Sequence, residues 1–191
     1  MKDILMMGLF VLILGGRLTT ALVGVDGFTA PRIEKNAELR LKSSVLKALE
    51  IPYTDENIEQ AFSNNVKTAE ENGTTYYIAA NGDYALPYEG SGLWGPIRGI
   101  IAMNPDLKEI AGLTIMEQEE TPGLGSRIAE KEYLEEFKDK RFAPELEMVS
   151  PGSADEENEI DSISGATMSS KAFIDILNAE HSRYLNILGG G

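Results

Sequence analysis

The first 27 residues, MKDILMMGLFVLILGGRLTTALVGVDG, constrain the fold more than any other part of the chain. From Ile4 to Val25 the residues are apolar or small, with Arg17 as the one charge. This run reaches the roughly 20 residues that a helix needs to cross the hydrocarbon core of a membrane. We therefore predict a single transmembrane anchor over residues 1–27.

Arg17 leaves other interpretations of this segment open. A charge inside a bilayer faces a protein partner or a wet cavity, or snorkels to an interface. The segment also fits a cleaved signal peptide, with Lys2 in the basic region and a weak cleavage site near Ala21. A buried helix of a soluble domain is a third choice. The anchor is favoured because apolar residues resume after Arg17 and no strong cleavage site follows.

Charge and composition exclude several classes of function. The chain has 191 residues, a net charge of -14, no cysteine and one histidine, His181. Nucleic-acid binding and docking on anionic lipid need basic patches, which are absent. Without cysteine there are no disulfides, iron–sulfur clusters or thiol catalysis, and one histidine argues against a zinc site. We predict no metal site, so a redox role would need an organic cofactor.

Residues 28–50 predict a connecting helix between the anchor and the rest of the chain. Pro31 suits its first turn, and one face carries apolar residues at helical spacing. These are Ile33, Ala37, Leu41, Val45 and Leu49.

Residues 51–191 predict one domain of mixed structure. Strands are expected over 74–80, 97–103, 110–116 and 146–149, and helices over 130–137 and from 167 to about 188. Phe173, Leu177, Tyr184 and Leu188 share one stripe of the last helix. The fold class is α+β, with a twisted, largely antiparallel sheet and flanking helices.

The stretch EIDSISGATMSS, residues 159–170, precedes the last helix. One interpretation is structural, with Thr167 or a serine as the helix cap. The other is chemical, because a helix N-terminus binds phosphate and a hydroxyl there lies close to the phosphorus. Gly165 and Ala166 let a bulky ligand or a modifying enzyme approach the backbone. Asp161 lies ahead of the turn, where it can help to position it.

Two glycine-rich stretches leave similar alternatives open. EQEETPGLGSR, residues 117–127, lacks the third glycine of a dinucleotide-binding motif and the lysine of a P-loop. It predicts either a tight turn after a strand or a loop that lies flat against a planar ring. In GSGLWGPIRGI, the only tryptophan, Trp94, is either a core residue or a ligand platform.

Other candidates are weak. The acidic run over 155–161 lacks the glycine and spacing of an EF-hand and predicts a solvated loop. His181 is expected on the surface of the last helix. Neither Gly-x-Ser-x-Gly nor His-Glu-x-x-His occurs, so hydrolase motifs find no support.

Together these stretches carry a resemblance. DSISGAT, from Asp161 to Thr167, resembles the flavinylation motif Asp-x-x-Ser/Thr-Gly-Ala-Thr of FMN-binding domains. The apolar span, TAPRIEKN, GLWGPI, ETPGLG and this motif follow in an order that resembles the G subunit of the Rnf ion-translocating complex. The order also resembles its relative, the C subunit of the sodium-pumping NADH:quinone oxidoreductase (Nqr). The compact length is more similar to the Rnf protein.

The resemblance implies a covalent cofactor. FMN would be joined to Thr167 through a phosphoester, which a flavin transferase forms from FAD. Asp161, Ser164, Gly165 and Ala166 would complete the recognition sequence of the transferase. Leu93 and Trp94 would lie near the isoalloxazine ring. The other wall of the site would be formed by Glu120, Thr121, Pro122, Gly123, Leu124 and Gly125.

The resemblance also implies a cellular role. The chain would be a membrane-anchored electron-transfer component of an Rnf-type ferredoxin:NAD oxidoreductase complex, and not a stand-alone enzyme. Its partners would be the other membrane and redox subunits, and its flavin domain would lie on the outer face of the cytoplasmic membrane. Alternatives are the C subunit of Nqr, an exported flavoprotein of extracellular electron transfer, and an anchored binding module without a cofactor.

Overall fold

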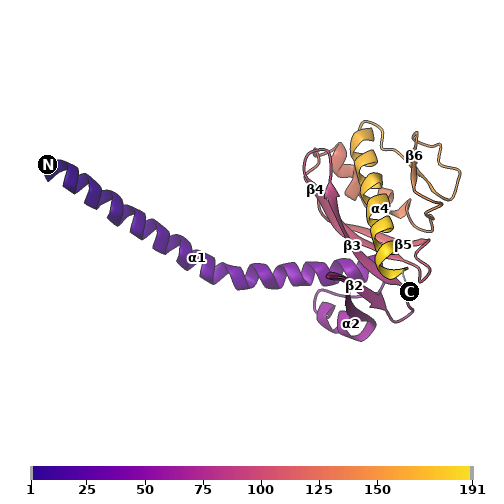
Figure 1. The fold of residues 1–191 in the computed structure, drawn as a ribbon, viewed down its shortest axis with the longest axis horizontal. Coiled ribbons are helices and arrows are strands. Elements are labelled where there is room, and N and C mark those ends of the chain that lie inside the picture. Colours follow the sequence, from indigo (N-terminus) through magenta and orange to yellow (C-terminus); the bar gives the residue numbers. More distant parts are fainter. Residues whose placement is uncertain (1, 190–191) are drawn as a thin grey trace. The chain divides into compact units, whose positions relative to one another are not determined.

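A computed structural model describes residues 2–189, which divide into two units, one up to Leu39 and one from Arg40 onward. Helix α1 (Lys2–Ala48) is continuous through this division (Figure 1). Its large apolar side chains between Ile4 and Phe28 are exposed. By length and composition this helix is able to cross a membrane, which is consistent with the predicted anchor.

The connecting helix differs from its prediction, because no new helix begins near Pro31. Pro31 lies inside α1. A proline removes one backbone hydrogen bond of a helix, and good helix formers follow it here. Of the apolar face predicted for residues 28–50, Ile33 and Ala37 are exposed, Leu41 and Leu49 are partly buried, and only Val45 is fully buried. Leu46 and Ala48, which lie outside the predicted face, are also buried.

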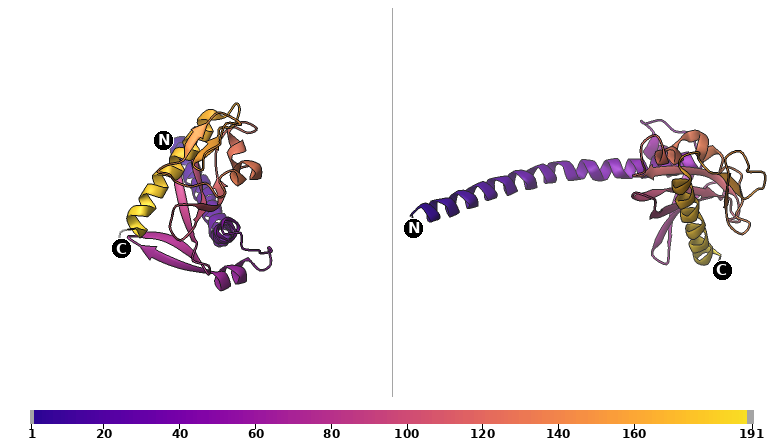
Figure 2. Two further views of the ribbon diagram at one scale, coloured as in Figure 1. Left: turned by 90° about the vertical axis from the view of Figure 1, so that its right-hand side faces the viewer. Right: turned by 90° about the horizontal axis from the view of Figure 1, so that it is seen from above.

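The compact unit is built on a five-stranded sheet in which consecutive strands pair antiparallel (Figures 1 and 2). Its strands are β1 (Val66–Glu71), β2 (Thr74–Ala79), β3 (Tyr84–Ser91), β4 (Pro96–Met103) and β5 (Ile110–Glu117). The strands predicted near 74, 97 and 110 and the α+β class are confirmed.

Two strands of this sheet were not predicted. β1 is polar and mostly exposed along its length. β3 contains Pro87 and Gly90, residues that argue against a central strand. Pro87 is tolerated because β3 pairs with β2 only at Tyr84 and Ala85, so that Pro87 has one neighbouring strand, β4.

The remaining elements follow the sheet or precede it. They are α2 (Ile58–Asn65), the 3₁₀ helix η1 (Gly125–Ala129), α3 (Lys131–Glu135), β6 (Glu147–Val149), β7 (Glu159–Asp161) and α4 (Thr167–Leu188). β6 and β7 form a parallel pair, so the predicted solvated loop at 155–161 ends in a short strand. α2 and η1 were not predicted.

Helix α4 packs against β3 and closes the core. The predicted stripe is largely buried, with Phe173, Leu177 and Tyr184 at 0–1% exposure. The Phe173 ring lies 5.9 Å from that of Tyr88 on β3 and 5.5 Å from that of Phe137. These aromatic contacts fix α4 along the sheet.

The expectation that His181 lies on the surface is wrong. Its side chain is buried on the core side of α4, stacked on Phe142 with ring centroids 3.8 Å apart. Its Nε2 lies 2.7 Å from the Leu107 carbonyl oxygen. Burial lowers the pKa of His181 more than this hydrogen bond raises it, so the pKa lies below the ordinary value.

Candidate functional site

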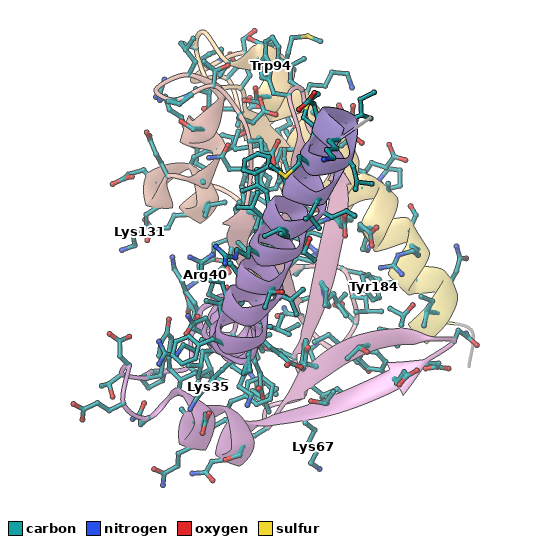
Figure 3. The ribbon with its side chains drawn as sticks, turned by 90° about the vertical axis from the view of Figure 1, so that its left-hand side faces the viewer. Lys35, Arg40, Lys67, Trp94, Lys131 and Tyr184 are labelled. Atoms are coloured by element: carbon teal, nitrogen blue, oxygen red, sulfur yellow. The ribbon has the colours of Figure 1, made fainter. Side chains whose placement is uncertain are left out.

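A cavity of about 450 Å³ brings together the three stretches singled out in the sequence. They lie far apart in the chain, and the fold places them around the start of α4. Figure 3 shows Trp94 at one end of the compact unit and Tyr184 on α4, away from that end. The cavity is lined by Leu93, Trp94, Thr121, Leu124, Gly125, Gly165, Ala166, Thr167, Met168 and Ser169.

The start of α4 presents Thr167 to this cavity. The helix begins at Thr167, and the preceding Ala166 makes no side-chain capping hydrogen bond. The prediction that Thr167 or a serine caps the helix is therefore wrong. Thr167 is instead the first helical residue, with an exposed side chain. The backbone reaches this position through Gly165, whose φ of 82° is one that residues with a Cβ rarely adopt.

The turn ahead of α4 is supported from both sides. The buried Ser170 hydroxyl accepts a hydrogen bond from the backbone N–H of Ile163, at 3.1 Å. On the outside, Arg127 Nη1 lies 3.5 Å from the Ser164 carbonyl oxygen. The guanidinium adds positive charge at a helix end whose free N–H groups already favour an anion. Arg127 was missed in the sequence, where only its place two residues after the Gly-Leu-Gly run could have indicated it.

The walls of the cavity are apolar and open. Leu93, Trp94, Leu124 and Met168 are 47%, 70%, 50% and 61% exposed. Trp94 is thus not a core residue. Monomers rarely expose a group of large apolar side chains unless it contacts a ligand or a partner.

Glu120 lies behind this wall and does not line the cavity. It is 4% exposed. Its Oε1 accepts hydrogen bonds from the backbone N–H groups of Leu93, at 2.7 Å, and Trp94, at 3.2 Å. Its Oε2 accepts one from the Ser169 hydroxyl, at 2.6 Å. One carboxylate therefore joins the Trp94 loop, the loop after β5 and α4.

Asp161 also faces away from the cavity. Its Oδ1 accepts backbone hydrogen bonds from Ser153, at 2.9 Å, and Ala154, at 3.0 Å. Burial raises the pKa of Asp161, but these bonds and one from Gly152 outweigh it and hold the pKa below its ordinary value. Asp161 thus orders the loop before β7.

Three other predicted site residues flank the lining without joining it. Ser164 is exposed beside Gly165. Pro122 and Gly123 form the turn closed by the hydrogen bond from Leu124 N–H to the Thr121 carbonyl, at 3.1 Å. Gly123 has a φ of 74°, which this turn requires.

The residues present fit FMN. The volume lies within the roughly 300–1,000 Å³ of small-molecule sites. The exposed faces of Trp94, Leu93 and Leu124 suit a planar ring, and the free N–H groups at the start of α4 suit a phosphate. The structure shows no group of acidic or histidine side chains suited to a metal among residues 2–189.

Comparisons with known proteins agree with this fit. Residues 92–180 match the family described as the FMN-binding domain. The C subunit of the Na(+)-translocating NADH-quinone reductase of Haemophilus ducreyi is 38% identical over 91 residues, which are 45% of this chain and 35% of that protein. Its counterpart in Neisseria meningitidis is 36% identical over 95 residues, 47% of this chain and 37% of its own length. The matches thus span little more than a third of these relatives.

Solved structures share the fold. The C subunit of the Parabacteroides distasonis Na(+)-translocating NADH-quinone reductase has a TM-score of 0.70 at 25% identity, covering 83% of this chain and 96% of its own. Shewanella oneidensis NqrC has a TM-score of 0.64 at 20% identity, covering 74% and 91%.

These comparisons support the resemblance to the Nqr protein, stated from the sequence as the alternative, better than that to the Rnf protein. The match over 92–180 includes every residue that lines the cavity. Residues 92–180 of this protein therefore match the FMN-binding domain, and the chain is similar in sequence and fold to the C subunit of the Na(+)-translocating NADH-quinone reductase.

Proposed function

We propose that this protein is a membrane-anchored electron carrier of the NqrC type, with FMN joined covalently to Thr167. The observation that carries the proposal is the place of Thr167 at the start of α4. Its exposed side chain lines a cavity whose other walls are the apolar faces of Trp94 and Leu124. A hydroxyl, an anion-binding helix end and a surface for a planar ring meet there.

FAD is the donor of the FMN group in the attachment reaction. Thr167 Oγ1 forms a bond to the phosphorus of the FMN half, the bond between the two phosphates breaks, AMP leaves and the hydroxyl proton is released. A flavin transferase performs this step during maturation. Ser164, Gly165 and Ala166 leave the hydroxyl accessible to that enzyme, because the first two are exposed and all three are small.

The chain's own groups then hold the cofactor in place. The N–H groups of the first turn of α4 and the Arg127 guanidinium stabilise the negative charge of the phosphodiester. Trp94, Leu93, Leu124 and Met168 would supply apolar contacts for the ring. Bound FMN supplies the electron-transfer chemistry, and the protein supplies position and electrostatics.

The apolar part of α1 holds this domain at the cytoplasmic membrane. Residues 1–27 act as a single-pass anchor, residues 28–50 as the connection and residues 51–191 as the FMN-binding domain on the outer face. Tethering raises the effective concentration of the flavin near its partners, which are the membrane and redox subunits of an Nqr-type complex.

Intact-mass spectrometry of protein from a host that contains the flavin transferase tests the attachment. We expect a mass increase of one FMN less one water and in-gel flavin fluorescence after denaturation, both lost in Thr167→Ala. Thr68→Ala, an exposed threonine on β1, is the matched control and should keep both. An unmodified parent chain, or flavin retained by denatured Thr167→Ala, would contradict the proposal.

Purification from native membranes tests the partners. Recovery of Nqr-type membrane proteins with the parent chain supports the assignment. Recovery of Rnf-type proteins in their place would assign this flavin carrier to an Rnf-type complex.

A further inference from the structure

The buried carboxylate of Glu120 is the only side chain, among residues 2–189, recorded with hydrogen bonds to both the Trp94 loop and α4. We propose that Glu120 is a positioning residue that sets the distance between these two cavity walls. The hydrogen bonds of Glu120 support this positioning role directly. Its effect on flavin binding rests on the proposed function.

The two oxygens of the Glu120 carboxylate accept hydrogen bonds from different elements. Oε1 accepts from two successive backbone N–H groups, those of Leu93 and Trp94, and so fixes the loop between β3 and β4. Oε2 accepts from the Ser169 hydroxyl, two residues after Thr167. Both oxygens act only as acceptors in these hydrogen bonds.

Two glycines leave room for this carboxylate. A Cβ on Gly92 would lie 2.5 Å from Oε1. A Cβ on Gly125 would lie 2.8 Å from Oε2 and 2.5 Å from Ser169 Oγ. The second glycine of the Gly-Leu-Gly run is therefore needed for Glu120 and Ser169 to meet.

Loss of Glu120 would change the geometry of the flavin site. Trp94 supplies one wall, and α4 carries Thr167. Glu120 holds the backbone of the Trp94 loop and the Ser169 hydroxyl of α4. Loss of Glu120 would therefore let Trp94 move relative to Thr167. Glu120 acts through these groups and not by contact with the ligand.

Hydrogen–deuterium exchange of the full chain in detergent, made without the flavin transferase, tests the mechanism. In Glu120→Ala we expect the amides of Leu93 and Trp94 to exchange at least about tenfold faster, because their acceptor is gone. Amides of Ile100 and Ile101 on β4 should not change. Glu120→Gln should keep most of the protection, since its carbonyl oxygen can accept both N–H groups.

Glu119→Gln is the matched control for this experiment, since Glu119 is the exposed neighbour of Glu120. It should exchange as the parent chain does. Unchanged Leu93 and Trp94 exchange in Glu120→Ala, or equal acceleration of the β4 amides, would overturn the inference. If Glu120→Ala does not fold, Ser169→Ala replaces it and should speed exchange severalfold in the first turn of α4 while sparing Trp94.

Coexpression with the flavin transferase tests the consequence. We expect Glu120→Ala to carry several times less FMN per folded chain, with a weaker visible circular dichroism of the flavin, and Glu120→Gln to restore both. A parent chain without FMN would contradict the proposed function, while the exchange result would still decide the role of Glu120. Parent and Glu120→Ala with equal yield and identical flavin dichroism would overturn the positioning role.

Discussion

The first two residues of α4 and its second half differ in exposure. At its start Thr167 and Met168 are exposed, and the N-cap residue makes no side-chain hydrogen bond. From Phe173 onward the inner face is buried in the core. The polar side chains there have partners, as the Tyr184 hydroxyl donates to the Pro87 carbonyl at 2.7 Å.

The difference explains how an uncapped helix start can remain ordered. Helix ends fray unless capping or packing holds them. Here the packed half of α4 fixes the helix axis, so that the first turn can keep its N–H groups free for a ligand. Sites on such scaffold elements are held more accurately than sites on loops.

Removal of the Phe173 side chain should have the largest effect on stability. Phe173→Ala empties a fully buried position between Tyr88 and Phe137, and we expect a loss of about 3–5 kcal/mol in the free energy of unfolding. Chemical denaturation in detergent measures it. Met168→Ala, exposed on the same helix, should change the free energy by less than about 1 kcal/mol. Equal losses in the two variants would remove the distinction between the two ends.

Gly165→Ala should affect the open end. Its φ of 82° makes a Cβ unfavourable there, and we expect a loss of about 1–2 kcal/mol or a shifted turn. The yield of covalent FMN on folded protein should fall with it. Gly73→Ala is the control, because Gly73 has a φ of 75° in the β1–β2 turn, away from the cavity. The same loss of FMN in both variants would show that strain alone, and not the place of Gly165, matters.

Tyr184→Phe should have a smaller effect at the packed end. It removes the hydroxyl that donates to Pro87, and we expect a loss of about 1 kcal/mol. Burial raises the pKa of Tyr184 to about 12, so this contribution should be constant from neutral to moderately alkaline pH. Thermal unfolding with Tyr53→Phe as the control measures it. An unchanged melting temperature would mean that this hydrogen bond adds nothing to the packing.

Acidification should have the smallest effect, through His181. Burial lowers the folded pKa of His181, so below about pH 6.5, the ordinary value, the unfolded chain binds the proton more readily than the folded one. The stabilisation of the fold by neutral His181 is complete above that pH, and it is lost as the pH falls through the folded pKa. Between about pH 8 and about pH 5 the parent should therefore lose more stability than His181→Gln. An equal loss in both would contradict this role.

The sequence predicted the elements that have a clear pattern. α4 begins and ends where its apolar spacing indicated, and β4 and β5 agree within a residue. β1 was missed because it is polar, and β3 because Pro87 and Gly90 are atypical of a strand. Their pairing depends on neighbouring strands that local propensity does not describe.

The same division holds for the site. Small residues at 165–166, the hydroxyl of Thr167 and the glycines around Trp94 were visible in the sequence, and these stretches do meet at one cavity. The buried role of Glu120 and the place of Asp161 against residues 153–154 were not visible. Both depend on where a carboxylate points.

By itself the sequence determined which segments are apolar, where the strongly patterned elements α4, β4 and β5 lie, and which residues have the chemistry to hold a phosphate. Local periodicity and side-chain type are sufficient for that, because they act over a few residues. Only the tertiary structure decided that residues 92–95, 120–125 and 165–169 meet, that Ala166 precedes an uncapped helix, and that His181 faces the core. These outcomes depend on contacts between residues far apart in the chain, which packing of α4 on the sheet brings together.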